Sequence, residues 1–486
     1  MSAPIISPTA ALTATTTSAS VASPISTAAG SSSAAPLPTI ATASATTTAP
    51  PPAASPVTAP PPSISASAGA GGAGAGALAV KPFAQFGEVF VSGSVAHSLT
   101  GRKDAPSSGG DGVPETNLYR FAHFSFFTGK KIVRIVASSV ACHYIAFDAM
   151  GGAYIWGRNE RGQLGTGDLV NRYRPVKIEL PGGAASVGFV DAAVGKSHTL
   201  LVTADGGLWA AGDNKQGQCG VGKDATFQAG TLLKWYKVAT LPGDKKCTAV
   251  AAGVDFSIAV AGQQVFAAGS QQYGQCGSGI TGEYIVTAGR IAYKELVGFR
   301  ALVGPISGVQ VVAVAAGANH GVALSVDGLP YTWGCGAYGR LGSAKPTDIM
   351  TAAPVVFFEP ERLRAKSIIA GASVTYVMTR AGVNPLIYHF GITKKTGEAT
   401  MKPAYIGDVV SMSCRALAVG PTSTILAADD TIVAWGPSPT SGELGFGEET
   451  KSSTKPKYVD DFEGTHAIAV SLVGDGEMLQ CDGEMY

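Results

Sequence analysis

The chain has 486 residues and carries 35 Lys and Arg against 34 Asp and Glu, a formal net charge of +1 at pH 7. This balance disfavours binding of nucleic acid by bulk electrostatics, which needs a clear excess of basic side chains. The sequence contains no apolar run of about 18 residues, so a membrane span is not expected.

Residues 1–80 have no charged and no aromatic side chain and consist mostly of Ala, Ser, Thr, Pro and Gly. Such a segment cannot bury enough apolar surface to offset the entropy lost on ordering, so we predict a disordered tail. The first cationic side chain belongs to Lys81. A secretory signal and a mitochondrial presequence both need earlier positive charges, and neither is predicted.

A repeated unit begins near residue 86. In each copy a β-type apolar run ends at a glycine, and polar residues with further glycines follow, as in "WGRNERGQLG" (Trp156 to Gly165). The anchor glycines recur every 45 to 65 residues, which is typical of a four-stranded propeller blade with its loops. They are Gly93, Gly157, Gly212, Gly269, Gly334, Gly391 and Gly436.

The residues around each anchor have the chemistry of tight turns. Gly162, Gly165 and Gly167 are expected to take positive φ, and Asn159 to bond the local backbone. Two further sets are expected to fill the space between sheets. They are the anchor tryptophans Trp156, Trp333 and Trp435, and the small apolar residues Leu164, Cys219, Cys276 and Leu341.

A second element precedes each anchor, as in "VGKSHTLLVTADG" (Val194 to Gly206), and predicts a strand that enters a hairpin. His143, His198 and His320 occupy one position of this element in three copies. The equivalent residues elsewhere are Phe256, Val374, Ser423 and Glu477, so we predict structural hydrogen bonds at this position rather than a metal site.

The two ends of the repeat region are incomplete in complementary ways. The segment 86–93 lacks a preceding strand, and the segment 466–481 lacks a following one. Pairing the two would complete a seventh blade and remove an open sheet edge. We therefore predict an all-β, seven-bladed propeller over residues 86–482, closed by its terminal strands, with few helices. The seven cysteines are widely spaced and form no C-x-x-C pair, which argues against a disulfide framework and against zinc.

These motifs resemble the regulator of chromosome condensation propeller family over residues 86–482. The unusual segments "GRKD" (Gly101 to Asp104), "WGCGAYGRLG" (Trp333 to Gly342) and "AWGPSPTSGELGFGEETKSST" (Ala434 to Thr454) are most similar to its second member, the telophase disk type. The resemblance implies an intracellular protein of the cytoplasm or nucleus that works by binding. Family partners include small GTPases, chromatin, microtubules and trafficking proteins. The uncharged tail departs from the basic extension usual in this type.

Two segments between anchors are longer than the rest, 101–131 and 278–310. Insertions on a rigid scaffold often carry recognition, and aromatic residues with arginine are the usual anchors of protein interfaces. The second segment is our candidate partner site, and the alternative is a loop packed on the propeller without a partner. Its candidate residues are Tyr284, Arg290, Tyr293, Lys294, Phe299 and Arg300.

No catalytic triad order, phosphate loop or dinucleotide fingerprint accompanies the repeats, so we predict no enzyme active site, cofactor or metal. The leading hypothesis is a monomeric propeller that binds a small GTPase and promotes guanine nucleotide exchange, with a role in the cell cycle or cytoskeleton. The alternative is a non-catalytic scaffold for spindle, microtubule or chromatin assemblies. Neither a membrane nor direct nucleic-acid binding is expected.

Overall fold

The computed structural model describes most of the chain after residue 85, and all described residues belong to one compact unit, Ala73–Tyr486. The predicted tail, residues 1–80, lies outside the described residues, as does most of the first long segment. The described ranges are 86–93, 118–222, 230–238, 241–380, 385–393, 398–421, 423–428, 430–436, 442–447, 453–462, 467–473 and 476–482.

The described residues form antiparallel sheets. The largest has eight strands in the order β29-β30-β1-β3-β4-β5-β6, with β2 also paired to β1. Its strands are β1 (Gly87–Gly93), β2 (Leu118–His123), β3 (Ile132–Val136), β4 (His143–Asp148), β5 (Ala153–Gly157), β6 (Arg172–Lys177), β29 (Ala467–Val473) and β30 (Gly476–Asp482).

Five four-stranded sheets and one two-stranded hairpin complete the set. The first two are β7 (Phe189–Val194), β8 (His198–Thr203), β9 (Leu208–Asp213), β10 (Thr231–Lys237), then β11 (Cys247–Ala252), β12 (Phe256–Ala261), β13 (Gln264–Gly269), β16 (Leu296–Ala301). The next are β17 (Val311–Ala316), β18 (His320–Ser325), β19 (Pro330–Gly334), β20 (Ile349–Pro354), then β21 (Ala365–Ala370), β22 (Val374–Thr379), β23 (Ile387–Ile392), β24 (Ala399–Tyr405). The last is β25 (Ala416–Val419), β26 (Thr424–Ala428), β27 (Thr431–Gly436), β28 (Ser453–Tyr458), and the hairpin is β14 (Glu283–Ile285) with β15 (Ile291–Tyr293).

Helices in the described part of the chain are short 3₁₀ turns, as the many glycines and prolines predict. They are η1 (Ser125–Phe127), η2 (Pro181–Val187), η4 (Thr287–Gly289), η5 (Ala337–Gly339), η6 (Val356–Phe358), η7 (Glu361–Leu363), η8 (Gly407–Val409) and η9 (Asp460–Phe462).

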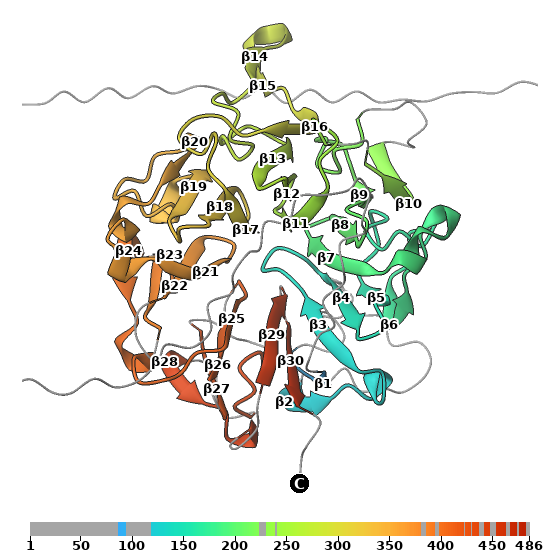
Figure 1. Cartoon of the computed structure of the whole chain (residues 1–486), viewed down its shortest axis with the longest axis vertical. Helices are drawn as coiled ribbons and strands as arrows, with labels where there is room; N and C mark the ends of the chain where they lie inside the picture. The colour runs from blue at the N-terminus through green and yellow to red at the C-terminus, as the bar shows by residue number, and fades with distance from the viewer. Residues whose placement is uncertain are drawn as a thin grey trace, which may run out of the picture. The chain divides into compact units, whose positions relative to one another are not determined.

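The sheets follow one another around a central axis, with the first strand of each nearest the axis (Figure 1). These inner strands contact one another in chain order, β3, β7, β11, β17, β21, β25 and β29, and β29 in turn contacts β3. The terminal strands β1 and β30 pair along their whole length, from Gly87 opposite Asp482 to Gly93 opposite Gly476. The all-β propeller fold is therefore present.

One backbone hydrogen bond recurs where neighbouring sheets meet. In five copies a residue just after the "GQLG"-type turn donates its N–H to a carbonyl on the outer strand of the next sheet, at 2.7 to 3.0 Å. The bonds tie each of these turns to the outer strand of the neighbouring sheet. They join Gly167 to Leu233, Gly222 to Val297, Gly279 to Met350, Ala344 to Met401 and Gly447 to Tyr119.

The glycines of the repeat are needed for two physical reasons. Gly157 has φ of +114°, and a Cβ there would lie 2.6 Å from the Cα of His143 on the paired strand. Gly165 has φ of +66°, and its Cβ would lie 2.5 Å from the indole nitrogen of Trp235 in the next sheet. Only glycine fits both demands. The predicted inward residues Leu164, Cys219, Cys276 and Leu341 are all buried.

Candidate interaction surface

The three repeat histidines are buried and form a relay across the seams between sheets. The Nε2 atoms of His143, His198 and His320 lie 2.7, 2.9 and 3.0 Å from hydroxyls of the next sheet, on Thr199, Ser257 and Thr375. Each hydroxyl donates to a backbone carbonyl of the preceding sheet, at Gln163, Gln218 and Arg340. The prediction that these histidines make structural hydrogen bonds is confirmed.

The relay fixes the state of each ring. Since the hydroxyl uses its single proton on the carbonyl, Nε2 must carry the imidazole proton and donate it. The Nδ1 atoms of all three rings are buried and have no hydrogen-bond partner among the described residues. Burial therefore lowers the pKa of His143 and of His320 to about 3, and that of His198 to about 4.

One of the seams without a histidine, at Phe256, has a matched replacement. Phe256 stands at the histidine position, opposite its anchor Gly269, and the next sheet carries Gly321, which has no hydroxyl, directly after His320, where Thr199 follows His198. A Cβ at Gly321 would lie 2.3 Å from the Trp333 indole, whose Nε1 donates to the Gln275 carbonyl at 2.9 Å. The indole therefore replaces the hydroxyl. In the terminal sheet, Gly476 and not the expected Glu477 stands opposite the anchor Gly93.

The second long segment forms a hairpin that projects from the rim of the propeller. β14 and β15 are inserted between β13 and β16 of one sheet and stand clear of the other sheets in Figure 1. Backbone and side-chain bonds hold the base of the hairpin: Lys294 N–H donates to the Gly282 carbonyl at 2.8 Å, and Gln271 Nε2 donates to the Lys294 carbonyl at 2.7 Å. Gln271 is itself buried, so the base is tied to the core.

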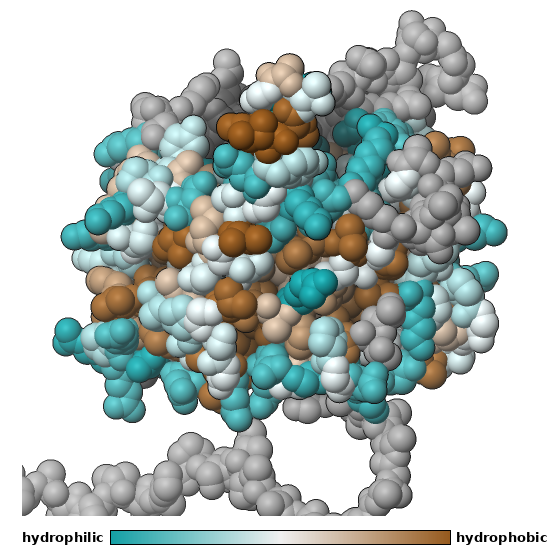
Figure 2. Space-filling view, turned by 90° about the horizontal axis from the view of Figure 1, so that it is seen from above, coloured by the Kyte–Doolittle hydropathy of each residue, from teal (hydrophilic) through white to brown (hydrophobic). Residues whose placement is uncertain are grey.

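The hairpin exposes apolar side chains. Ile285 and Ile291 are paired across the strands near the tip and are 76% and 57% exposed, and Tyr284 is half exposed. A hydrophobic cluster is visible where the hairpin points toward the viewer (Figure 2). Contiguous exposed apolar surface of this kind is typical of interaction sites. The candidate set predicted from the sequence omits both isoleucines. Ile285 follows Tyr284 and Ile291 precedes Ala292, and these two short apolar runs could have indicated a pair of strands.

The candidate residues fall into two groups. Tyr284, Arg290, Tyr293 and Lys294 lie on or beside the hairpin, and Arg290 and Lys294 are exposed. Arg300 is also exposed but lies on β16, in the blade itself. The structure thus brings four of the six candidates together.

Phe299 is the exception, because its side chain is buried in the core. A Cβ at Gly220 would lie 2.4 Å from its ring, as a Cβ at Gly445 would from Phe121. Phe299, Phe121 and Trp235 thus occupy one structural position, the aromatic that joins an outer strand to the preceding sheet. We therefore assign Phe299 to the core and not to a surface that binds a partner.

The described residues contain no group of three His, Cys, Asp or Glu side chains placed to hold a metal ion. None of the helices in the described ranges is long and apolar enough to cross a membrane. One cavity, between β6 and β10, has a volume of 620 Å³, and another is lined by the inner strands around the axis.

Comparison with known proteins places these features in a family. The regulator of chromosome condensation (RCC1) repeat profile matches residues 150–202, and a second profile of the same repeat matches residues 189–218 and 311–340. The chain is 32% identical to Protein RCC2 homolog of Xenopus laevis over 81% of this chain and 77% of that protein. It is 32% identical to human Protein RCC2 over 79% of this chain and 74% of that protein.

Solved structures agree on the fold. Human WBSCR16 superposes with a TM-score of 0.67 at 18% identity, covering 82% of this chain and all of that one. Yeast RCC1 (Prp20), solved bound to Kap60, superposes with a TM-score of 0.65 at 18% identity over 87% of this chain and 96% of that one. The repeats, the propeller and the identity to RCC2 together show that this chain belongs to the regulator of chromosome condensation family and resembles RCC2 within it.

Proposed function

We propose that this protein is an interaction propeller whose β14–β15 hairpin engages a small GTPase and promotes release of its guanine nucleotide. The observation that supports it most is the pair of exposed isoleucines on a hairpin whose base is fixed to the core. A fixed base lets the apolar tip enter a partner without the entropic cost of ordering a loop. Prp20p from Saccharomyces cerevisiae, which shares this fold at 18% identity, has binding properties to Gsp1p and histones.

The proposed exchange needs no bond-making by this chain. An apolar wedge that enters the nucleotide site would compete with the contacts that hold phosphate and magnesium. The hairpin would then bind the nucleotide-free partner more tightly than the loaded one, and that difference in affinity shifts the partner toward release. Arg290 and Lys294 are exposed beside the apolar tip, and their charges would attract carboxylates of the partner.

We also propose that the propeller has seven blades, closed by the chain ends, over residues 86–482. The eight-stranded sheet would then hold two blades, β3–β6 and β29-β30-β1-β2. Three facts support this division. β1 meets β3 at one residue pair only, Gly87 with Ile132. The Gly447 bond to Tyr119 joins β2 to the preceding sheet as an outer strand. Ser92 Oγ donates to the Glu443 carbonyl at 3.3 Å, at the relay position of that seam.

Release of a fluorescent nucleotide from purified Rho, Ral, Arf and Ran-type GTPases, with and without this protein, tests the exchange activity. Acceleration should be lost in the double variant Ile285→Asp with Ile291→Asp, because charges at the tip would oppose entry into an apolar site. A matched control places the same charges on exposed residues elsewhere, Met150→Asp with Val356→Asp, and should keep full activity.

The alternative is a scaffold without exchange activity for spindle, microtubule or chromatin assemblies. The exposed hairpin serves that role equally well, since binding alone requires only the apolar tip. Partners that are captured from extract through the hairpin, with no acceleration of any GTPase, would favour the scaffold. Either activity is expected in the cytoplasm or nucleus and from a monomer, which light scattering on the purified protein can test.

A further inference from the structure

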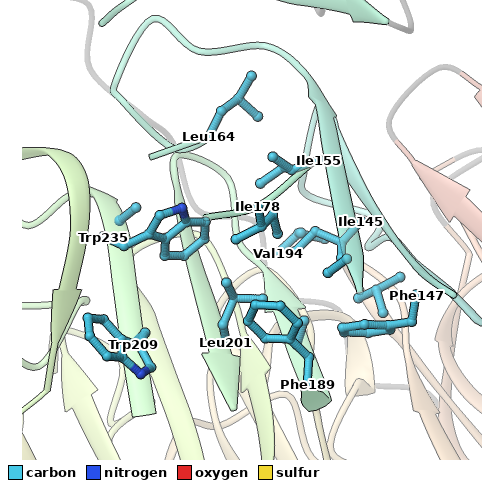
Figure 3. Packing of buried hydrophobic residues seen from close by; sticks show 14 of the residues in the cluster. Ile145, Phe147, Ile155, Leu164, Ile178, Phe189, Val194, Leu201, Trp209 and Trp235 are labelled. Carbon is cyan, nitrogen blue, oxygen red and sulfur yellow. The ribbon is translucent and has the colours of Figure 1, made fainter. Parts of the chain in front are cut away.

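A groove lies at the seam between β6 and β10, away from the hairpin. Its volume of 620 Å³ falls within the usual range of ligand sites. The floor is apolar and buried, and Figure 3 shows Leu164, Ile155 and Ile178 close to the indole of Trp235. Lys177 and Lys234 also line the groove.

The rim of this groove is basic. Arg172 is paired with Asp168 at 2.5 Å, whereas within the described ranges Lys177 and Lys234 have no carboxylate within salt-bridge distance. Both lysines are exposed, and Glu179 is the single acidic residue of the lining. Two unpaired cations beside an apolar floor complement a ligand that has an apolar anchor next to negative charge.

The backbone of β6 limits how such a ligand can bind. Pro175 lies in the middle of this outer strand and has no N–H, so the strand cannot pair fully with an added strand. Recognition would therefore use side chains and not strand addition. Next to Arg172 in the chain, Leu169, Val170 and Tyr173 are each more than half exposed and extend the apolar surface.

We propose that the groove between β6 and β10 is a docking site for a short acidic peptide segment of a partner protein. An apolar side chain of the peptide would rest on Trp235 and Ile178, and its carboxylates would pair with Lys177 and Lys234. Folded nucleic acid fits less well, because the apolar floor has no charged group for its phosphates and Glu179 repels them.

The test uses the full chain and a fluorescein-labelled peptide of alternating Asp or Glu with Leu and Trp, followed by polarisation. We expect saturable binding that weakens with added salt, since the lysines are exposed to solvent. Binding should fall at least about tenfold in Lys177→Glu with Lys234→Glu, because both attractive charges become repulsive. The matched control, Lys345→Glu with Lys366→Glu, reverses two exposed lysines elsewhere and should bind as the wild type does.

Three results would overturn the proposal. One is no saturable binding up to about 1 mM peptide, which corresponds to negligible affinity. Another is equal binding of a peptide with Ala in place of Leu and Trp, because charge alone would then explain the signal. The third is a dimer in light scattering that dissociates in Lys177→Glu with Lys234→Glu, which would assign the groove to a second copy. The GTPase assay is independent, so its failure would leave this site standing.

Discussion

Trp156 lies on β5 without contact with solvent, in an apolar cluster to which β1, β3 and β4 also contribute. Its indole stacks on Tyr144 with ring centres 5.3 Å apart and an angle of 10°, and it meets Phe124 and Phe127 at steep angles. Tyr144 belongs to the neighbouring strand β4, and Phe127 to the 3₁₀ turn η1. One side chain thus joins two strands and a turn.

We expect Trp156→Ala to lower the free energy of unfolding by about 3–5 kcal/mol, because the surrounding rings cannot fully collapse into the space. Urea unfolding followed by circular dichroism measures this value. Met150→Ala, at a side chain that is 90% exposed, is the control and should change it by less than about 0.5 kcal/mol. A loss below about 1 kcal/mol for the tryptophan variant would contradict this packing of the indole.

The relay histidines predict loss of stability in acid. Unfolded histidine binds a proton near pH 6.5, whereas the folded rings have pKa values of about 3 to 4. Between these values the unfolded chain binds more protons, so the free energy of unfolding falls as pH falls, by up to ~1.4 kcal/mol per pH unit for each ring. His320→Gln keeps an N–H donor for Thr375 but cannot titrate. In this variant the number of protons bound on unfolding should fall by about one, which reduces the slope of the free energy of unfolding against pH. An unchanged slope between pH 6 and 4.5 would show that His320 is not the titrating group.

At the scale of the element, the sequence predicted the turns better than the surface. Glycine and asparagine around each anchor act through the local backbone, so the role of Asn159 could be assigned from the sequence: its Oδ1 accepts from Leu164 N–H at 2.9 Å. The side of a strand that faces a neighbouring sheet depends on contacts distant in the chain. The sequence therefore did not separate Phe299 from the surface candidates, although "LKWY", "VGFR" and "YRFA" put Trp235, Phe299 and Phe121 in comparable positions.

Several outer strands carry a proline at one register position. In three outer strands the last residue that pairs with the third strand of the sheet is Lys177, Tyr405 or Tyr458. A proline lies two residues before each of them: Pro175, Pro403 and Pro456. An outer strand presents an unpaired edge, and a proline there removes a donor that another chain could use. These prolines therefore limit edge-to-edge association of the blades.

The hairpin element gives a prediction that separates binding from folding. Arg290→Ala with Arg300→Ala should weaken GTPase or other partner binding severalfold and leave the melting temperature nearly unchanged, because both side chains are exposed and interface arginines are frequent anchors. Calorimetry and a pulldown with the double variant measure the two effects. A large drop in melting temperature would instead assign these arginines to the fold. Lys345→Ala with Lys366→Ala serves as a charge-matched control.

For the whole molecule, pairing of β1 with β30 should decide stability. A chain that starts at residue 86 keeps β1 and should unfold with the wild-type midpoint, since residues 1–80 have too little apolar side chain to form a core. A chain that starts at residue 94 lacks β1, which removes the strand that pairs with β2 and leaves β30 paired with β29 alone, and it should lose most of its cooperative unfolding transition. Equal midpoints for the two truncations would argue against closure by the terminal strands.

The hydrogen-bond relay also makes each blade specific for its place in the ring. His198 requires the hydroxyl of Ser257 in the next sheet. The sheet that follows Phe256 has Gly321 in place of a hydroxyl residue, and the Trp333 indole donates the hydrogen bond instead. A blade transplanted one position along the chain would set an imidazole against Gly321, or leave a serine without its donor. Blades of this protein are therefore not interchangeable modules, and any attempt to lengthen, shorten or shuffle the ring would have to exchange adjacent blades as matched pairs.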